Sequence, residues 1–248
     1  PGAAVLGVDA ALHTGVGMVR YLGPSRPTAL VLQRRPEAVA ASGRVQAWVL
    51  GSGQDAADRD EVTEELLARA LSQPVPQVLD SGSLDRIQDA TGPVVITPHA
   101  GELAAVLGIE RSVVQDDPEA AAVRAASRFG ITVLLKGHRT VVASPAGLRH
   151  TVVASTTWLA TAGSGDALAG ILGALVATHA AAVAEDPALL ADLAATAAVL
   201  HGRAGERASR GGPFTVLDLS AELPAVIADL LAPRRPGRGR GHRGVSRR

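Results

Sequence analysis

One short stretch, ATAGSGDALAG at residues 160–170, places a single carboxylate, Asp166, between small residues and an apolar run. Glycines at a helix start let the backbone approach a ligand closely, and the free N–H groups there attract anions. A carboxylate at the same end can act as general base toward an attacking hydroxyl. The stretch therefore indicates either a site for phosphoryl transfer with Asp166 as base, or an ordinary helix start at which Asp166 is a capping or first-turn acid.

The stretch TPHAGE at residues 97–102 also allows two interpretations. Glu102 lies three residues beyond His99 at the start of a predicted helix, which is the spacing of a capping box. Alternatively, His99 lies in a cleft and contacts a polar substrate.

Lys136 and Gly137 end a predicted strand. The lysine is a point charge for a phosphate or, alternatively, a solvated side chain at a strand end. His201 lies in an Ala-rich predicted helix and is interpreted as a core or surface histidine. The His, Asp and Glu residues show no metal-ligand spacing, so we expect any magnesium to arrive with nucleotide phosphates.

The elements that must position these residues alternate between strand and helix patterns, which predicts a three-layer α/β domain with a mostly parallel sheet flanked by helices. The predicted strands lie within residues 17–22, 28–33, 45–53, 76–80, 92–98 and 131–137, with a hairpin over 139–153. The predicted helices lie within residues 2–13, 59–73, 99–108, 117–130, 166–178, 187–209 and 219–232.

Four of these strands end on polar or flexible residues. Because the carboxyl ends of parallel strands meet at one edge of a sheet, we expect these residues to line a common cleft. They are Gly51-Ser52-Gly53, Asp80, Thr97-Pro98-His99 and Lys136-Gly137.

Composition limits the remaining possibilities. The chain has 248 residues, is 47% hydrophobic but only 2% aromatic, and lacks cysteine, which excludes disulfides and thiolate zinc sites. Its net charge of zero combines an acidic body, residues 1–232, with a tail, residues 233–248, that carries seven Arg and no acid. We expect the tail to be disordered and the body not to bind nucleic acid. The longest apolar run, 167–178, is too short for a membrane span, and no signal peptide is evident.

The motifs taken together resemble the ADP/ATP-dependent NAD(P)H-hydrate dehydratases, metabolite-repair enzymes with a ribokinase-like fold. The resemblance extends from residue 1 to about 232. It is carried by VVITPHAGELAAVLG, ITVLLKGHRTVVASPAGLRHTVV, LATAGSGDALAGILGALVA and AATAAVLHGRAGE, in that order. It implies that ADP or ATP phosphorylates the hydroxyl of hydrated NADH or NADPH and that loss of phosphate restores the ring. It also implies a magnesium-dependent, cytoplasmic, homo-oligomeric enzyme, often a tetramer.

The resemblance assigns roles to individual positions. Asp166 matches the catalytic base and a substrate-binding carboxylate. The hydrate contacts match His99, Gly53 and Ala3, and the nucleotide-binding positions match Lys136, Gly137, His138, Arg139, Thr140, Gly163 and Gly165.

The chain also departs from the family. GSGQD at residues 51–55 puts Asp55 where the family's turn has its last glycine, and STTWLA at 155–160 replaces an Asn-bearing stretch. The family's first strand and glycine-rich turn, expected ahead of residue 1, are absent. Two alternatives to the dehydratase stay open: another ribokinase-like kinase, acting on a hydroxymethylpyrimidine or thiazole alcohol, and a non-catalytic nucleotide-binding homologue.

Overall fold

The computed structural model describes residues 1–154 and 156–232, so the predicted tail at 233–248 lies outside the described residues. A six-stranded sheet runs through the molecule in the order β1-β2-β3-β4-β5-β6. The strands are β1 Trp48–Leu50, β2 Gln77–Leu79, β3 Val94–Ile96, β4 Thr132–Leu135, β5 Arg139–Ala143 and β6 Arg149–Val153. Strands β1 to β4 are parallel, and β5 and β6 join them as an antiparallel hairpin. This confirms the predicted mostly parallel sheet.

Side chains alternate between the two faces of the sheet, as the pleat requires. Val78, Val95 and Leu134 belong to one apolar core, whereas their neighbours Leu79, Ile96, Val133 and Leu135 belong to the other. Because both faces are buried, these strands are mostly apolar, with Gln77 in β2 and Thr132 in β4 as buried polar residues, in keeping with the sequence runs that predicted them.

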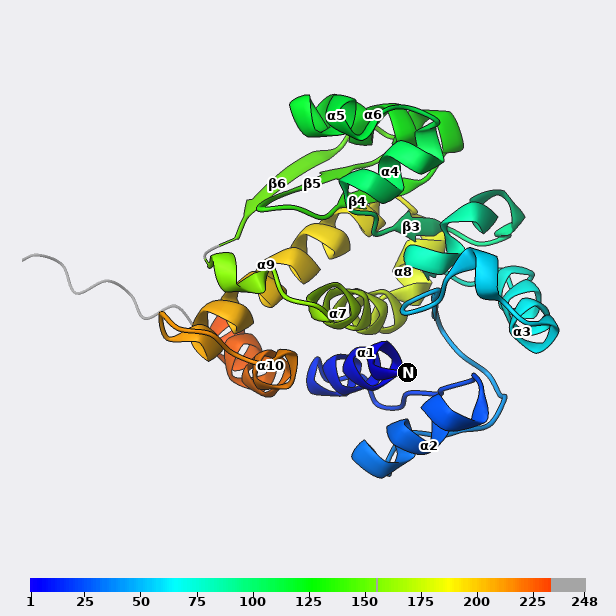
Figure 1. The fold of residues 1–248 in the computed structure, drawn as a ribbon, viewed down its shortest axis with the longest axis vertical. Helices are drawn as coiled ribbons and strands as arrows, with labels where there is room; N and C mark the ends of the chain where they lie inside the picture. Colours follow the sequence, from blue (N-terminus) through cyan, green and yellow to red (C-terminus); the bar gives the residue numbers. More distant parts are fainter. Residues whose placement is uncertain (155, 233–248) are drawn as a thin grey trace, which may run out of the picture.

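Helices cover both faces and make the three layers (Figure 1). The helices α3 Glu61–Leu71, α4 Ala100–Leu107, α5 Arg111–Asp116 and α6 Pro118–Phe129 cover one face. The helices α7 Ser164–Thr178, α8 Ala180–Glu185 and α9 Leu189–Ser209 cover the other, with α1 Gly2–His13 and α10 Val216–Leu231 packed behind them. The remaining elements are α2 Ser25–Arg34 and the short 3₁₀ segments η1 Ala56–Asp58, η2 Ser81–Asp89 and η3 Thr157–Leu159.

Helices α1 and α7 cross at unusually small residues. A Cβ added to Gly170 would lie 2.2 Å from the carbonyl oxygen of Gly7, and one added to Gly7 would lie 3.5 Å from the carbonyl oxygen of Asp166. The two backbones therefore nearly touch, which brings the start of α1 to the end of the sheet where α7 begins.

Two predicted strands are not formed. Residues 28–33 lie inside α2, because Pro27 fits the first turn of a helix and Val31 alone of the helix is buried, against α1. Residues 17–22 are extended but form only an isolated parallel bridge, between Arg20 and Val39. All of the predicted helices are present, with boundaries shifted by at most a few residues.

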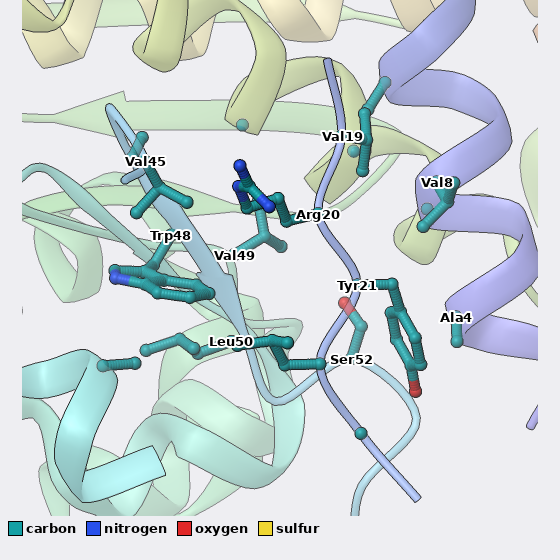
Figure 2. Close-up of a pocket in the computed structure, with 18 of the residues that line it drawn as sticks. Ala4, Val8, Val19, Arg20, Tyr21, Val45, Trp48, Val49, Leu50 and Ser52 are labelled. Atoms are coloured by element: carbon teal, nitrogen blue, oxygen red, sulfur yellow. The ribbon is translucent and has the colours of Figure 1, made fainter. Parts of the chain in front are cut away.

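An apolar groove of about 260 Å³ separates β1 from the extended segment 17–22. Figure 2 shows Trp48 and Val49 on one side of it, Val19 and Tyr21 on the other, and Ala4 of α1 at its edge. Trp48 and Leu50 make the backbone bonds from β1 to β2, so the backbone groups of Val49, which alternate with them, face the groove.

Candidate active site

The polar ends of the parallel strands meet around one buried carboxylate, Asp80. Its Oδ1 accepts hydrogen bonds from Thr97 Oγ1 at 2.7 Å and from Lys136 Nζ at 2.8 Å, and its Oδ2 accepts one from Ser52 Oγ at 3.1 Å. These side chains come from the ends of β1, β2, β3 and β4. The prediction that the four strand ends share one edge of the sheet is thus confirmed.

Helix α7 begins directly beside this cluster. Gly163 is its N-cap with a φ of +89°, and a Cβ there would lie 2.4 Å from Leu6 Cδ1, so only glycine fits both the backbone angle and the space. A Cβ added to Gly165 would lie 3.3 Å from Lys136 Nζ. The first turn of α7, with its free N–H groups, therefore lies over the amine of Lys136, and together they form a site suited to an anion.

Asp166, in the first turn of α7, is half-buried. Burial raises its pKa from the ordinary value to about 6, and the negative charge of Asp80 acts in the same direction, whereas Lys136 opposes the rise. No side-chain hydrogen bond caps the helix at its N-cap residue, Gly163. A carboxyl group that changes protonation near neutral pH, next to an anion site, has the properties of a general base.

His99 forms the capping box that its spacing allows. Its Nδ1 accepts a hydrogen bond from the Glu102 backbone N–H at 3.0 Å, and Glu102 Oε2 accepts one from the His99 backbone N–H at 2.7 Å. The imidazole is nonetheless 61% exposed, and the isolated bridge between His99 and Lys136 holds it at the same edge of the sheet. Its Nε2 lies 3.7 Å from Glu102 Oε1, so both ring nitrogens are near Glu102, and a substrate contact by His99 stays a prediction.

Gly53 and Ala3 lie against each other. Gly53 has a φ of +68°, and a Cβ added there would lie 2.3 Å from the Cβ of Ala3. The turn after β1 thus packs on the start of α1, next to Ser52 and its bond to Asp80. The structure brings these two positions together, and their contact with a hydrate stays a prediction.

The proposed nucleotide-binding positions that follow Lys136 form the tight connection between β4 and β5. Thr140 Oγ1 donates to the Gly137 carbonyl at 3.2 Å, and the carbonyl of His138 accepts from the Ala154 backbone N–H at 2.9 Å. Arg139 begins β5 and is exposed. The loop is held by its own backbone, with the His138 and Arg139 side chains directed to solvent.

Two departures from the family pattern have local explanations. Asp55 has an extended backbone, with φ of −109°, and its side chain caps η1 by accepting from Ala57 N–H at 3.0 Å. Thr156 caps η3 in the same way through Trp158 N–H. Residue 155, the first of the substituted stretch, lies outside the described residues.

Several residues of the site had no assigned role in the sequence. Asp80, Thr97 and Ser52 were recognised only as polar residues at strand ends, and Glu102 only as a possible cap. In the structure, Glu102 Oε2 is 3.8 Å from Lys136 Nζ. His201, left open between core and surface, is buried in α9 and contacts Ser164 at the start of α7. The sequence signal for most of them was their common place at the carboxyl end of a strand.

Within residues 1–154 and 156–232, no group of three or more His, Cys, Asp or Glu side chains is arranged to hold a metal ion. In the same part of the chain, no helix is both long and apolar enough to cross a membrane.

Comparison with known proteins agrees with this geometry. The family model for NAD(P)H-hydrate dehydratase matches residues 1–224. A bifunctional NAD(P)H-hydrate repair enzyme of Mycobacterium tuberculosis is 42% identical over 190 residues, which are 72% of this chain and 38% of that protein. An ADP-dependent (S)-NAD(P)H-hydrate dehydratase of Xanthomonas campestris is 32% identical over 255 residues, covering 93% of this chain and 84% of that one.

Solved structures give the same result. The ADP/ATP-dependent NAD(P)H-hydrate dehydratase of Bacillus subtilis, co-crystallised with ATP/Mg²⁺, has a TM-score of 0.77 and 26% identity over 92% of this chain and 85% of its own. The predicted ribokinase-like fold is thereby confirmed. The chain spans less than half the length of the first curated relatives that it matches, 38% to 48%. With its family model covering nearly the whole folded body and its site built on the expected strand ends, the chain belongs to the NAD(P)H-hydrate dehydratase family.

Proposed function

We propose that this domain dehydrates the hydrated form of NADH or NADPH with ADP or ATP as co-substrate. The observation that carries the proposal is Asp166, a half-buried carboxyl with a pKa raised to about 6, in the first turn of a helix that lies over Lys136. The family match supplies the substrate, because its named members act on this hydrate.

In the proposed reaction Asp166 takes the proton of the hydrate's hydroxyl as that oxygen attacks the terminal phosphorus of the nucleotide. The bond between this phosphorus and the bridging oxygen breaks, and the shortened nucleotide leaves. Phosphate then departs with the electron pair of the C–O bond, the neighbouring ring carbon loses a proton to water, and the nicotinamide double bond is restored. The free N–H groups at Gly165 and its neighbours hold the transferring phosphoryl group, whose charge grows on oxygens that point toward the helix start.

Magnesium fits this site as part of the nucleotide. The described residues offer no set of three ligands for a resident ion, and the carboxylate of Asp80 is already engaged by Lys136, Thr97 and Ser52. Oxygen donors are what the ion prefers, and the phosphates of the nucleotide would supply them. The ion would neutralise part of the phosphate charge.

Recovery of the reduced nicotinamide tests the proposal directly. Hydrated NADH or NADPH is incubated with the protein, magnesium and either ADP or ATP, and the absorbance band of the reduced ring is followed. Return of the band with one nucleotide and not without it supports the proposal. If neither nucleotide restores the band, the dehydratase assignment is wrong. Phosphorylation of a hydroxymethylpyrimidine or thiazole alcohol would then identify a kinase, and nucleotide binding without turnover a non-catalytic homologue.

We propose further that residues 1–232 form one domain and that the groove beside β1 receives an extended strand, the one that the resemblance predicts ahead of residue 1. The backbone groups of Val49 face the groove from one side. Those of Arg20 face it from the other, because its neighbours Val19 and Tyr21 are the residues bonded to Val39. A parallel strand between them would pair with both edges.

Hydrogen exchange at the amides of Val49 and Arg20 tests this placement. The exchange rates of the two amides are compared between a protein of residues 1–248 and a longer form that also contains the proposed strand. Slower exchange at both positions in the longer form is expected, and equally fast exchange in both forms would overturn the placement.

The cytoplasmic location and the homo-oligomer, as a tetramer, are proposed from the family resemblance alone. Light scattering on the purified protein gives the oligomeric state, and a monomer at working concentrations would contradict the tetramer. Cell fractionation gives the location.

A further inference from the structure

Asp80 is a carboxylate that is almost completely buried, which is rare for an acidic side chain. It is 2% exposed and lies at the end of β2, in the middle of the parallel strands. Three side chains from three other strand ends donate to it, namely Ser52, Thr97 and Lys136. Burying a carboxylate costs several kcal/mol unless a charge partner and hydrogen bonds compensate, so this arrangement needs all of its donors.

The positive charge that pairs with Asp80 is the amine of Lys136, and contacts at both ends of the lysine hold it in one place. The backbone N–H of Lys136 donates to the Pro98 carbonyl at 2.7 Å, which anchors the start of the side chain. At the other end of the side chain, Nζ is 2.8 Å from Asp80 Oδ1. A Cβ added to Gly165 would lie 3.3 Å from the same Nζ. The amine is therefore held between the end of the sheet and the first turn of α7.

We propose that Asp80 is a positioning residue of this active site, which fixes the amine of Lys136 against the start of α7 and opposes negative charge on Asp166. This rests on the proposed function, in which Asp166 is the base. The contacts of Asp80 are with Ser52, Thr97 and Lys136, through which it acts.

The charges around Asp166 support this role. Burial contributes most to its raised pKa, the carboxylate of Asp80 contributes next, and Lys136 acts in the opposite direction. Glu102 adds negative charge 3.8 Å from Lys136 Nζ, and the histidine packed against the start of α7, His201, is held neutral because burial lowers its pKa to about 4. Asp80 thus partly cancels the effect of Lys136, which alone would keep Asp166 ionised and weakly basic.

The test is a titration of Asp166 in Asp80→Asn, followed by NMR of ¹³C-labelled carboxyl groups without nucleotide or hydrate. Asparagine keeps the shape of the side chain and an oxygen for Thr97, so the variant is expected to fold. Without the charge of Asp80, and with Lys136 unopposed, the pKa of Asp166 should fall below about 6. The matched control is Asp85→Asn, which removes a carboxylate that bonds Arg59 and not Lys136, and it should leave the Asp166 titration unchanged.

Two further measurements keep the result decisive. In active enzyme, the acid limb of the kcat/KM pH profile should move to lower pH in Asp80→Asn together with the NMR titration, which a merely structural role would not produce. If Asp80→Asn does not fold, Lys136→Met must shift the Asp166 pKa upward. An unchanged titration in a folded Asp80→Asn, or an unchanged one in Lys136→Met, overturns the proposal. Because the titration needs no turnover, it stays readable even if the dehydratase assignment fails.

Discussion

The imidazole of His201, buried in α9, lies 3.0 Å through its Nε2 from both the hydroxyl and the carbonyl oxygen of Ser164, the first residue of α7. The long helix behind the sheet therefore holds the turn that presents Gly165 and Asp166. A neutral imidazole with a proton on Nε2 donates to the carbonyl, and the burial of the ring favours this uncharged form in the folded protein.

The burial of His201 predicts a loss of stability in acid. Burial lowers the pKa of His201 to about 4, below the ordinary value of 6.5. The unfolded chain therefore binds this proton more readily than the folded protein, and the contribution of His201, present above pH 6.5, is lost as pH falls toward 4. The loss should be on the order of 2–3 kcal/mol.

Urea unfolding at pH 7, 5 and 4 measures the effect, with His201→Gln as the control. Glutamine can donate to the Ser164 carbonyl but cannot take up a proton. Other groups titrate in both proteins, so the quantity compared is the difference between them. The wild type should lose stability relative to His201→Gln as the pH falls, and a constant difference would show that His201 is not protonated on unfolding.

The second prediction concerns turnover. Asp166→Asn should lower kcat by at least ~10²-fold and change nucleotide affinity only a few-fold, because the amide cannot accept the hydroxyl proton while the N–H groups of α7 remain. The measurements are hydrate dehydration kinetics and nucleotide titration by calorimetry. A variant with near wild-type turnover would make Asp166 a first-turn acid of the helix and remove it from the mechanism.

The third prediction is that the same substitution stabilises the fold. The folded-state pKa of Asp166 is raised to about 6, so its favourable contribution is present at pH below the unfolded value and is lost as pH rises through 6. Asparagine does not ionise and avoids that loss. Since the carboxyl is partly exposed and screened by solvent, the gain at pH 8 should be only about 1 kcal/mol. Thermal unfolding at pH 8 and pH 4 should show the gain at pH 8 and only a small part of it at pH 4, close to the unfolded pKa. Equal gains at both would point to a cause other than charge.

Much of this site follows from the sequence, for a physical reason. Short apolar runs that end on Asp80 or Lys136 are typical of buried parallel strands, and the carboxyl ends of such strands meet at a common edge. The error over residues 28–33 shows the limit. A six-residue run of mixed apolar and polar side chains is compatible with a strand and with one face of a helix. The burial of Val31 against α1 decides between the two, and this is a tertiary contact that the local sequence does not show.

The role of Asp80 could not be predicted from its own neighbourhood. The stretch DSGSL at residues 80–84 contains no signal that its one carboxylate would receive donors from residues as distant as Ser52 and Lys136. Similarly, the Ala-rich surroundings of His201 gave no indication of Ser164, 37 residues earlier, as its partner. Both sets of contacts form only when the strands and α9 pack together. The sequence therefore shows the individual residues but not which of them contact one another.

The last prediction separates the packing of the turn after β1 from its backbone angle. Gly53 and Gly147 both have positive φ, +68° and +89°, but a Cβ on Gly53 would lie 2.3 Å from the Cβ of Ala3, whereas one on Gly147 meets nothing within 4 Å. Both alanine substitutions carry the cost of the left-handed backbone, about 1 kcal/mol. Gly53→Ala must in addition push α1 away from the turn and should lose a further ~1–3 kcal/mol.

Urea unfolding of the two variants measures this difference, and the KM for the hydrate is measured alongside it. If Gly53 and Ala3 help to enclose the hydrate, Gly53→Ala should raise KM while Gly147→Ala, in the β5–β6 turn away from the parallel strand ends, leaves it unchanged. Equal stabilities for the two variants would mean that α1 yields freely at this point. In that case the start of α1 would be too loosely held to position Ala3 against a substrate.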